Sequence, residues 1–532
     1  MKLDNLTSER DVSESSLTRY CSHFIGSFLM FFLLIPYVNG NTNILLILSD
    51  DLNTRLGTYG DTVVKTPNLE MLAAHGTQFE RAYVQYPQCT QSRSSFLTGL
   101  YPDQTGVVDW SGLTKYFRDY VPNVETLPQV FKRNGYFTAA VGKIFHHGPS
   151  ERLDGGFYDD TEIWNDNTGS WDQMISPQRI DHKPQQQKNV QYLGPILEPK
   201  NIERNYQGGW LGWARLGGSP EDYVDGVTTM RALEILDRQQ EKNHKKPFFL
   251  AVGYNLPHVP FAVPDEYFDM YPIKDIVVRN NPKNDREDIP FVHLADKPYE
   301  LDMSEEQEKI LLQGYFASVS FVDKQVGYLL NKLDELGLRE STVVVFASDH
   351  GFLLGEHDLW QKPNLFEDTL RIPLIISSPY AKQKGKVSNS IVELVDIYPT
   401  ILDLANIAIP SHVASRSFAD LLDAPHMTFR ASALSQSHSQ AMSDKRKSAV
   451  LSRPGVQLQG MLGYSIRTDR YRYTEWGEGI HGGEMYDHKE DPEEFNNIWG
   501  DTGYSDVKKQ LQVLLRKRIE LARERKPDFK AI

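Results

Sequence analysis

The hydrophobic and polar positions of this chain fall into two alternating patterns. Continuous apolar runs recur along it, and such runs are typical of strands that are buried on both faces of a parallel sheet. They span residues 43–49, 137–141, 247–254 and 342–348. Between the last two runs, residues 308–336 place apolar side chains at the spacing of an amphipathic helix. The alternation predicts an α/β fold with a large, doubly wound, mostly parallel sheet.

The pattern changes in two places. Residues 152–218 are rich in Asp, Asn, Gln, Gly and Trp with little periodicity, which predicts long loops over one end of the sheet. Residues 463–476 alternate as two antiparallel strands around a turn at Thr468-Asp469, and residues 507–525 form a basic amphipathic pattern. We therefore expect a main α/β domain over residues 41–423 and a smaller α+β subdomain over residues 424–532.

The first forty residues have the features of a signal peptide. Residues 24–35 are apolar and uncharged, Arg19 and His23 precede them, and Gly40 offers a small residue for cleavage. The apolar core is too short for a stable membrane anchor. The single Asn-x-Ser/Thr acceptor lies inside this leader, at Asn5. We expect an exported protein, periplasmic or secreted and bacterial rather than lysosomal, whose mature chain does not span a membrane.

Charge limits the partners of the protein. The chain has 57 Lys and Arg against 71 Asp and Glu, a formal net charge of −14. Because phosphate binding needs a basic face, this balance argues against nucleic acid as a partner. An anionic substrate is still possible, since basic residues in a cleft dominate the field at short range.

Acidic side chains follow two of the predicted strands. Asp50 and Asp51 end the run at 43–49, and Asp349, His350 and Gly351 end the run at 342–348. Carboxyl ends of parallel strands meet at one edge of the sheet, where open α/β folds bind ligands. Three carboxylates suggest a hard divalent cation, calcium or magnesium. The alternative is that Asp and Gly serve only as turn formers after a strand.

Cys89 is the only cysteine after the leader, so it has no partner for an internal disulfide. If a helix begins at this residue, Arg93 lies one turn later on the same face, and the free N–H groups of the helix start face any bound anion. Free cysteines are often small buried hydrophobes. The coincidence of Cys89 with two acidic strand ends favours a functional site.

These motifs carry a family resemblance. The chain contains ILSDD, then C-x-x-S-R-x-x-x-L-T-G, G-Y-x-T-x-x-V-G-K, P-H-x-P and SDHG…GEH…K in that order. This set resembles the type I sulfatases of the alkaline phosphatase superfamily. The stretches VGKIFHHG at 141–148, FFLAVGYNLPHVPF at 248–261 and SDHGFLLGEH at 348–357 are most similar to the iduronate-2-sulfatase branch. The resemblance implies a sulfuric ester hydrolase with an alkaline phosphatase-like fold.

The resemblance also implies a mechanism. A formylglycine-generating enzyme would oxidise Cys89 to formylglycine (3-oxoalanine), and one hydroxyl of the hydrated aldehyde would attack sulfur and displace the sugar alcohol. The second hydroxyl would then lose its proton and expel sulfate, which regenerates the aldehyde. A bound Ca²⁺ or Mg²⁺ would neutralise sulfate oxygens and polarise the nucleophile. Its ligands would be Asp50, Asp51, the Cys89-derived group, Asp349 and His350, the last at a position where many relatives carry Asn.

Basic residues would complete the pocket by the same resemblance. Arg93 matches the position that steadies the formylglycine hydroxyl, and Lys143 and Lys362 match those that hold sulfate oxygens. His146 and His258 match the acid/base and leaving-oxygen positions. Taken singly, each lysine could be a solvated surface charge, and His258 could be a loop residue that bonds to backbone.

One residue departs from the family pattern. The family's maturation signal normally has Pro or Ala two residues after the cysteine, and this chain has Gln91. If the maturing enzyme rejects Gln91, Cys89 stays a thiol. Two alternatives therefore stand beside an active sulfatase: a phosphate or phosphonate monoester hydrolase of the same superfamily, and a non-catalytic carbohydrate-binding relative with unmodified Cys89.

The expected substrate is a sulfated oligosaccharide or polysaccharide. The branch resemblance suggests a 2-O-sulfated uronic acid or related sugar from a glycosaminoglycan or an algal polysaccharide. Lys445, in the run Lys445-Arg446-Lys447, loosely resembles a lysine that contacts a uronate carboxylate. The alternative for this run is a solvated cluster of charges.

Overall fold

The structure is a computed structural model, and nine parts of the chain are described. They are residues 42–108, 117–146, 169–175, 190–192, 211–240, 246–294, 303–362, 364–439 and 461–524. The leader predicted at 1–40, Lys445 and most of the loops predicted at 152–218 lie outside these residues. None of the helices in the described parts has the length and apolar content needed to cross a membrane.

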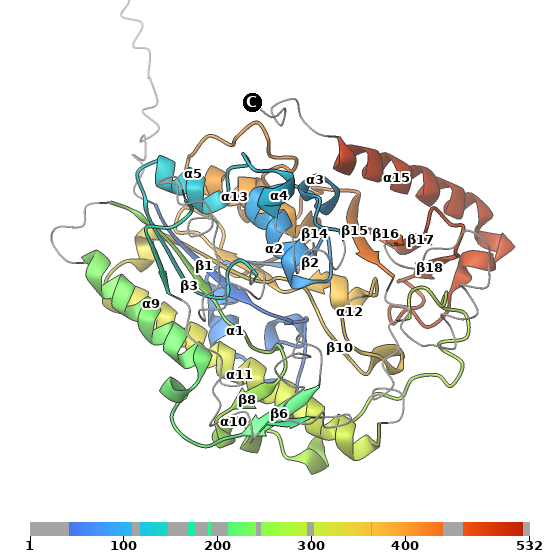
Figure 1. The fold of residues 1–532 in the computed structure, drawn as a ribbon, viewed down its shortest axis with the longest axis horizontal. Coiled ribbons are helices and arrows are strands. Elements are labelled where there is room, and N and C mark those ends of the chain that lie inside the picture. Colours follow the sequence, from blue (N-terminus) through green and yellow to red (C-terminus); the bar gives the residue numbers. More distant parts are fainter. Residues whose placement is uncertain are drawn as a thin grey trace, which may run out of the picture. The chain divides into compact units, whose positions relative to one another are not determined.

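A nine-stranded sheet forms the centre of the fold, and its middle strands are parallel (Figure 1). Here β1 (Asn43–Ser49) lies between β9 (Thr342–Ser348) and β7 (Phe248–Gly253), with Leu46 opposite Val345 and Ala251. Beyond β7 come β3 (Phe137–Gly142) and the edge strand β4 (Gln173–Ile175), both parallel. The four predicted apolar runs are thus central strands, and the α/β fold class is confirmed.

The other half of the sheet is mixed. β13 (Leu374–Ser377) is antiparallel to both β9 and β2 (Thr77–Tyr83). The short β12 (Arg371–Ile372) is antiparallel to β2, whereas β14 (Lys386–Glu393) runs parallel to it. Parallel pairing therefore prevails where acidic residues follow the strands.

Helices cover both faces of the sheet (Figure 1). The alternating side chains of β1 belong to two separate apolar cores, with Leu46 in one and Leu45 in the other. α2 (Cys89–Thr98), α5 (Leu127–Arg133) and α13 (Ile397–Leu404) pack into the first core. α1 (Pro67–Ala74), α9 (Val224–Gln240) and α11 (Glu305–Glu335) pack into the second core. The shorter helices are α3 (Pro102–Thr105), α4 (Phe117–Tyr120), α10 (Asp265–Asp269) and α12 (Glu367–Leu370).

The long helix α11 begins three residues before its predicted start at 308. Ser304 Oγ accepts the Gln307 N–H at 3.3 Å, and Gln307 Oε1 accepts the Ser304 N–H at 2.8 Å. This reciprocal pair satisfies two N–H groups that a helix start leaves free. The apolar spacing could not show it, because the first turn is formed by polar residues.

A four-stranded antiparallel sheet follows in the C-terminal part, in the order β15 (Ser432–His438), β16 (Leu462–Thr468), β17 (Tyr471–Trp476) and β18 (Gly483–Asp487). The helix α15 (Ser505–Arg523) packs on it through Leu511, Leu515 and Ile519. The turn between β16 and β17 lies at residues 469–470, one position later than predicted. β16 continues through Thr468, whose hydroxyl accepts the N–H of Tyr471 at 2.9 Å. The domain boundary at residue 423 stays a prediction.

The loop prediction over 152–218 is wrong for three short strands. Besides β4, these are β5 (Gln191–Tyr192) and β6 (Gly212–Arg215), and β6 pairs in parallel with β8 (Phe261–Val263). Strands of two to four residues are too short to show a period of two. Their partners are also distant in sequence, so only the tertiary fold supplies the pairing.

Candidate active site

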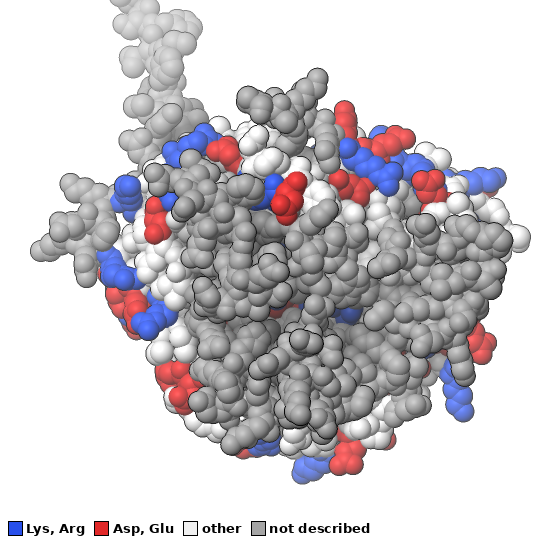
Figure 2. Space-filling model, viewed as in Figure 1, with Lys and Arg blue, Asp and Glu red and all other residues white. Residues whose placement is uncertain are grey.

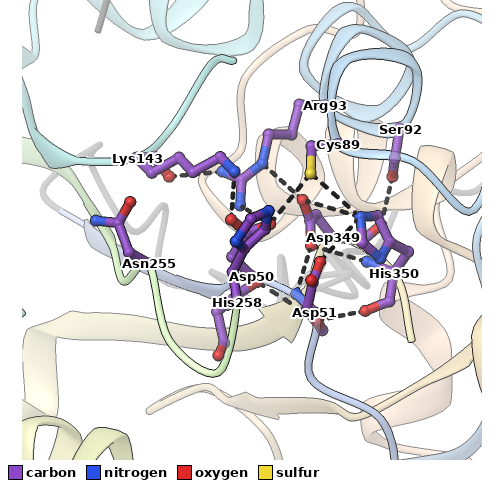
Figure 3. Close-up of polar contacts among 12 residues, drawn as sticks. Asp50, Asp51, Cys89, Ser92, Arg93, Lys143, Asn255, His258, Asp349 and His350 are labelled. Carbon is purple, nitrogen blue, oxygen red and sulfur yellow. Dashed lines mark hydrogen bonds and ion pairs between the residues drawn. The ribbon is translucent and has the colours of Figure 1, made fainter. Parts of the chain in front are cut away.

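The ends of β1 and β9 are linked by direct hydrogen bonds. Asp349 Oδ1 accepts the N–H of Asp51 at 3.3 Å, and the Asp349 N–H donates to the Ser49 carbonyl at 3.2 Å. The hydroxyl of Ser348 accepts the Leu52 N–H at 3.0 Å and donates to a backbone carbonyl at 2.7 Å, that of His350. The structure thus brings the two acidic strand ends together in the fully buried cluster of Figure 3.

Cys89 is the first residue of α2 and faces this cluster. Its Sγ lies 3.3 Å from Asp50 Oδ1, 3.4 Å from His350 Nε2 and 3.2 Å from Lys362 Nζ. Arg93 follows one helical turn later on the same face, as residues spaced by four do. Its Nε donates to Asp349 Oδ2 at 2.8 Å. The helix therefore presents a thiol and a guanidinium to the acidic strand ends.

Two lysines neutralise the aspartates that follow β1. Lys143 Nζ is hydrogen-bonded to Asp50 Oδ2, and Lys362 Nζ to Asp51 Oδ1. Lys143 follows β3 through Gly142, whose φ of 78° favours glycine. A Cβ at Gly142 would lie only 2.1 Å from the carbonyl oxygen of Gly253. A residue without a side chain is therefore required for β3 to deliver Lys143 to the site.

The two histidines named by the resemblance lie near the same charges. His258 is buried, and its Nδ1 is 2.7 Å from the Val259 carbonyl oxygen. Its positive charge contributes to the low pKa of Asp50, which places it within electrostatic reach of that carboxylate. His146 is partly exposed as a residue, but its Nδ1 is shielded from solvent. Burial and the charge of Lys143 hold the pKa of His146 well below its usual range.

Neighbouring charges give the two aspartates opposite pKa shifts. Burial would raise the pKa of Asp50, but Lys143, His258 and Lys362 together hold it well below its usual range. Burial raises the pKa of Asp51 to about 7, although Lys362 opposes the rise and Asp50 adds to it. The two carboxyl groups that follow β1 therefore differ strongly in how readily they lose a proton.

The thiol and the imidazole of the cluster are shifted as well. Burial and Asp50 would raise the pKa of the Cys89 thiol, but Lys143 and Lys362 lower it overall. Burial would lower the pKa of His350, but the neighbouring Asp349 carboxylate raises it to about 9. Shifts of this kind are concentrated at functional sites, although structural ion pairs also cause them.

The donor set of the cluster fits a divalent cation. One ligand atom from each of Asp50, Asp51, Cys89 and His350 lies within 4.8 Å of the others. Asp51 Oδ2 is buried without a hydrogen-bond partner among the described residues. A buried carboxylate oxygen without a partner is costly, and a cation removes that cost. We conclude that these residues can hold a metal ion.

A second group of side chains that could ligate a metal consists of Glu367, His488 and Glu494, but its carboxylates are already paired with other protein groups. Arg472 is hydrogen-bonded to both carboxylates of this group. Tyr83 donates to Glu367 Oε1 at 2.8 Å, and the N–H of Glu367 donates to Glu494 Oε2 at 2.8 Å. Because their oxygens already accept from protein donors, we assign this group to an ion-pair network between the C-terminal sheet and α12.

Two supporting residues were missed by sequence reasoning. The Tyr315 hydroxyl donates to the Asp51 carbonyl at 2.9 Å and accepts the Asn53 N–H at 2.9 Å, so it fixes the turn after β1. Asp225, near the start of α9, accepts the N–H groups of Asn255 and Leu256 at 2.8 and 2.9 Å. This contact holds the loop that carries His258. The helical spacing identified Tyr315 only as a core residue, and no local pattern distinguished Asp225.

The surface charge is dispersed on the face drawn in Figure 2. Basic and acidic side chains of the described residues are interspersed around its rim.

The chain is similar to several known proteins over most of its length. Residues 42–407 match the family model described as Sulfatase, and residues 455–521 match the model described as N-sulphoglucosamine sulphohydrolase, C-terminal. Iduronate 2-sulfatase of Homo sapiens is 32% identical to this chain, in an alignment that covers 87% of this chain and 92% of that protein. An ulvan-active sulfatase of Formosa agariphila is 29% identical to this chain, in an alignment that covers 90% of this chain and 81% of that protein.

A solved structure shares the fold at lower identity. The phosphonate monoester hydrolase of Agrobacterium radiobacter superposes with a TM-score of 0.69 at 21% identity, over 90% of this chain and 96% of that one. At this identity the likeness concerns the fold alone.

Proposed function

The chain belongs to the sulfatase family of the alkaline phosphatase superfamily and is a sulfuric ester hydrolase; on that premise we propose that it releases sulfate from a sulfated saccharide. One observation carries the proposal: Cys89 shares a buried cluster with acidic ligands and two lysines. Relatives named for iduronate and for ulvan support a sulfated uronic acid or related sugar of a glycosaminoglycan or algal polysaccharide.

We propose that a formylglycine-generating enzyme converts Cys89 to formylglycine. The hydrated aldehyde supplies the hydroxyl that attacks sulfur, and it releases sulfate when the aldehyde re-forms. Gln91, which departs from the family's maturation signal, is buried in α2 two residues after Cys89. Its side chain is thus part of the folded helix rather than of an accessible loop, and the maturing enzyme would meet it before folding.

The metal proposal uses the same cluster. Asp50, Asp51, His350 and the Cys89-derived group, which lie close enough to share an ion, would hold it together with Asp349, the ligand that the resemblance adds. Calcium is expected and magnesium is the alternative, because most of the donors are oxygens. When bound, the cation would neutralise sulfate oxygens and polarise the attacking hydroxyl.

Side chains of this chain supply the remaining chemistry. Lys143 and Lys362 flank Cys89 and would bind the sulfate oxygens, on which charge builds up during transfer. Arg93 is wholly buried between Asp349 and the carbonyl oxygens of residues 143 and 144, so it would orient the attacking hydroxyl without moving.

The two histidines, His146 and His258, would serve as the general base and the general acid. The depressed pKa of His146 keeps its imidazole neutral near pH 7, which suits a base that accepts the proton of the nucleophile. His258 would donate a proton to the oxygen of the leaving alcohol. Together they would let the sulfur–oxygen bond of the ester break without releasing a free alkoxide.

Three further proposals concern regions beyond the cluster. Residues 1–40 would direct export to the periplasm or the medium of a bacterial cell. The catalytic α/β domain would end near residue 423, and the smaller C-terminal α+β subdomain would follow it. Lys445 would contact the carboxylate of a uronate ring.

A panel of defined sulfated oligosaccharides, assayed for released sulfate, tests the substrate class. We expect turnover of 2-O-sulfated, carboxylated disaccharides, with Lys445→Ala lowering kcat/KM for them by about tenfold and sparing a small aryl sulfate. Faster turnover of aryl phosphates than of aryl sulfates would favour a phosphate or phosphonate monoester hydrolase, whose fold the chain shares. Binding of the oligosaccharides without turnover, with unmodified Cys89, would indicate a carbohydrate-binding relative.

A further inference from the structure

Lys362 follows a hairpin with an unusual backbone. The hairpin pairs β10 (Leu353–Leu354) with β11 (Trp360–Gln361) in antiparallel register. His357, Asp358 and Gln361 have φ values of 57°, 53° and 70°, in the left-handed region that favours glycine. Such conformations persist only where the surroundings hold them in place. The hairpin that delivers Lys362 therefore needs an external support.

The segment at 279–285 contacts the tip of this hairpin. Arg279 donates to Glu356 Oε1 at 3.1 Å. Asn281 Nδ2 donates to the carbonyl oxygen of Gly355 at 2.7 Å and to a carboxylate oxygen of Asp358 at 2.8 Å. These contacts hold both the backbone and the side chains of the tip.

Asp285 adds the most deeply buried contact of this segment. Its Oδ2 lies 2.9 Å from Nδ1 of His357, and both side chains are almost fully buried. Burial would lower the pKa of His357, but the hydrogen bond and the charge of Asp285 raise it overall. The pair therefore fixes the imidazole of His357 at the tip of the hairpin.

The chain after Lys362 is held by a second histidine. His293 Nε2 accepts the N–H of Leu365 at 2.7 Å, and its Nδ1 lies 2.7 Å from Glu484 Oε1. A backbone N–H can only donate, so Nε2 carries no proton and Nδ1 donates to the Glu484 carboxylate. His293 is thus fixed at both nitrogens.

A stack of three rings joins the two supports. Phe366 lies between the imidazoles of His357 and His293, with ring centroids 3.9 and 4.3 Å apart and interplanar angles of 20° and 25°. Lys362 is located between the two held positions in the sequence, five residues after His357 and three before Leu365. The backbone on either side of Lys362 is therefore anchored to one rigid group of rings.

We propose that Asp285 and His293 are positioning residues for Lys362: through the ring stack they set where its ammonium meets Asp51 and Cys89. The inference rests on the proposed role of Lys362 in binding sulfate. It goes further in assigning a function to a segment that lies outside the catalytic cluster. A small displacement of a catalytic ammonium group is enough to lower the rate strongly.

Asp285→Ala tests the proposal, with Asp288→Ala as a matched control. Asp288 lies three residues after Asp285, but its Oδ2 accepts the Asn497 N–H at 2.9 Å, and among the described residues no hydrogen bond or ion pair joins its side chain to the hairpin. We expect Asp285→Ala to lower kcat/KM for an aryl sulfate at least tenfold and Asp288→Ala to change it less than twofold. Asp285→Asn keeps a hydrogen-bond acceptor for His357, so its kcat/KM should lie between those of the two alanine variants. It replaces Asp285→Ala in the test if the alanine variant fails to fold.

A double-mutant cycle separates positioning from general destabilisation. In a Lys362→Gln background, assayed at high enzyme concentration, Asp285→Ala should lower kcat/KM less than twofold, because the amine that Asp285 positions is already absent. If Asp285→Ala lowered kcat/KM by the same factor in both backgrounds, or if Asp288→Ala lowered it as much as Asp285→Ala, the proposal would be overturned.

A second measurement does not depend on activity. Acetic anhydride should acetylate the Lys362 amine several-fold faster in Asp285→Ala than in the unsubstituted protein or in Asp288→Ala, as followed by peptide mass spectrometry. Equal rates would overturn the positioning role. If no variant and no unsubstituted protein turns over a sulfate ester, the proposed function fails, and the labelling rates still decide whether the segment positions Lys362.

Discussion

The Nε of Arg93 donates to Oδ2 of Asp349 at 2.8 Å, and both side chains are completely shielded from solvent. This bond joins the second turn of the helix that begins at Cys89 to the residue that follows β9. It therefore fixes Cys89, the proposed nucleophile position, against the proposed metal ligands. Arg93 also lies 3.7 Å from Asp50, so its charge acts on both acidic strand ends.

Arg93→Gln should destabilise the protein as well as inactivate it. Removing one partner of a buried ion pair leaves the other charge uncompensated and typically costs about 3–5 kcal/mol of unfolding free energy. The control is Arg231→Gln, because Arg231 pairs with Glu234 at 2.9 Å with both side chains about half exposed. That change should cost about 0.5 kcal/mol or less. Similar unfolding free energies for the two variants in urea would contradict the structural role of Arg93.

Asp349→Ala should impair metal binding while the fold is retained. The substitution removes a proposed ligand and a contact to the backbone of Asp51. We expect activity to fall by several orders of magnitude and calcium affinity, measured by calorimetry, to fall with it. Unchanged turnover of the unsubstituted enzyme after exhaustive treatment with a chelator would remove the metal from the mechanism.

Glu494→Gln should change how stability depends on pH. Burial would raise the pKa of Glu494, but Arg472 and His488 lower it to about 2 from an ordinary value of 4.5. A carboxyl group with a lowered pKa stabilises the folded state above its unfolded pKa, and this contribution is lost as pH falls through the folded pKa. The expected contribution near pH 6 is about 3 kcal/mol at most.

The measurement for Glu494 is the difference in unfolding free energy between the unsubstituted protein and Glu494→Gln at several pH values. The difference should be largest near pH 6 and should shrink between about pH 4.5 and pH 2, because the protonated carboxyl resembles the amide. A difference that stays constant over this range would show that the charge of Glu494 does not stabilise the C-terminal network.

Cys89 should be oxidised in the native host despite Gln91. Mass spectrometry of the peptide that contains Cys89 should then show a mass lower than that of the thiol form by about one water molecule. A thiol that alkylates completely in protein from the native host would contradict this expectation. Protein from a foreign host is a weaker test, because its maturing enzyme can reject Gln91.

The central strands and the acidic strand ends could be predicted from sequence because both signals are local. The apolar run of β1 has the predicted bounds, as does that of β9, and Asp50 and Asp349 follow them directly. The parallel arrangement then brings the strand ends together by topology alone. The sequence left open whether a helix begins at Cys89, and the structure places the first residue of α2 there.

Other parts of the site could not be read from local pattern. Lys143, His146, His258 and Lys362 come from four separate segments, and only the family resemblance connected them before the structure did. Asp225 and Asp285 hold the segments near His258 and Lys362 through hydrogen bonds to residues 30 or more positions away. Their sequence neighbourhoods are ordinary for surface acids, so the signal exists only in the folded chain.

Release of inorganic sulfate from an aryl sulfate, measured for protein purified from its native host and for its Cys89→Ala variant, tests whether Cys89 provides the nucleophile of a sulfatase. We expect sulfate release to exceed phosphate release from the matching aryl phosphate, and we expect it to be lost in Cys89→Ala although the variant folds. Sulfate release that persists in the variant, or no release by a protein shown to carry the oxidised residue, would contradict the assignment of Cys89 as the nucleophile of a sulfatase.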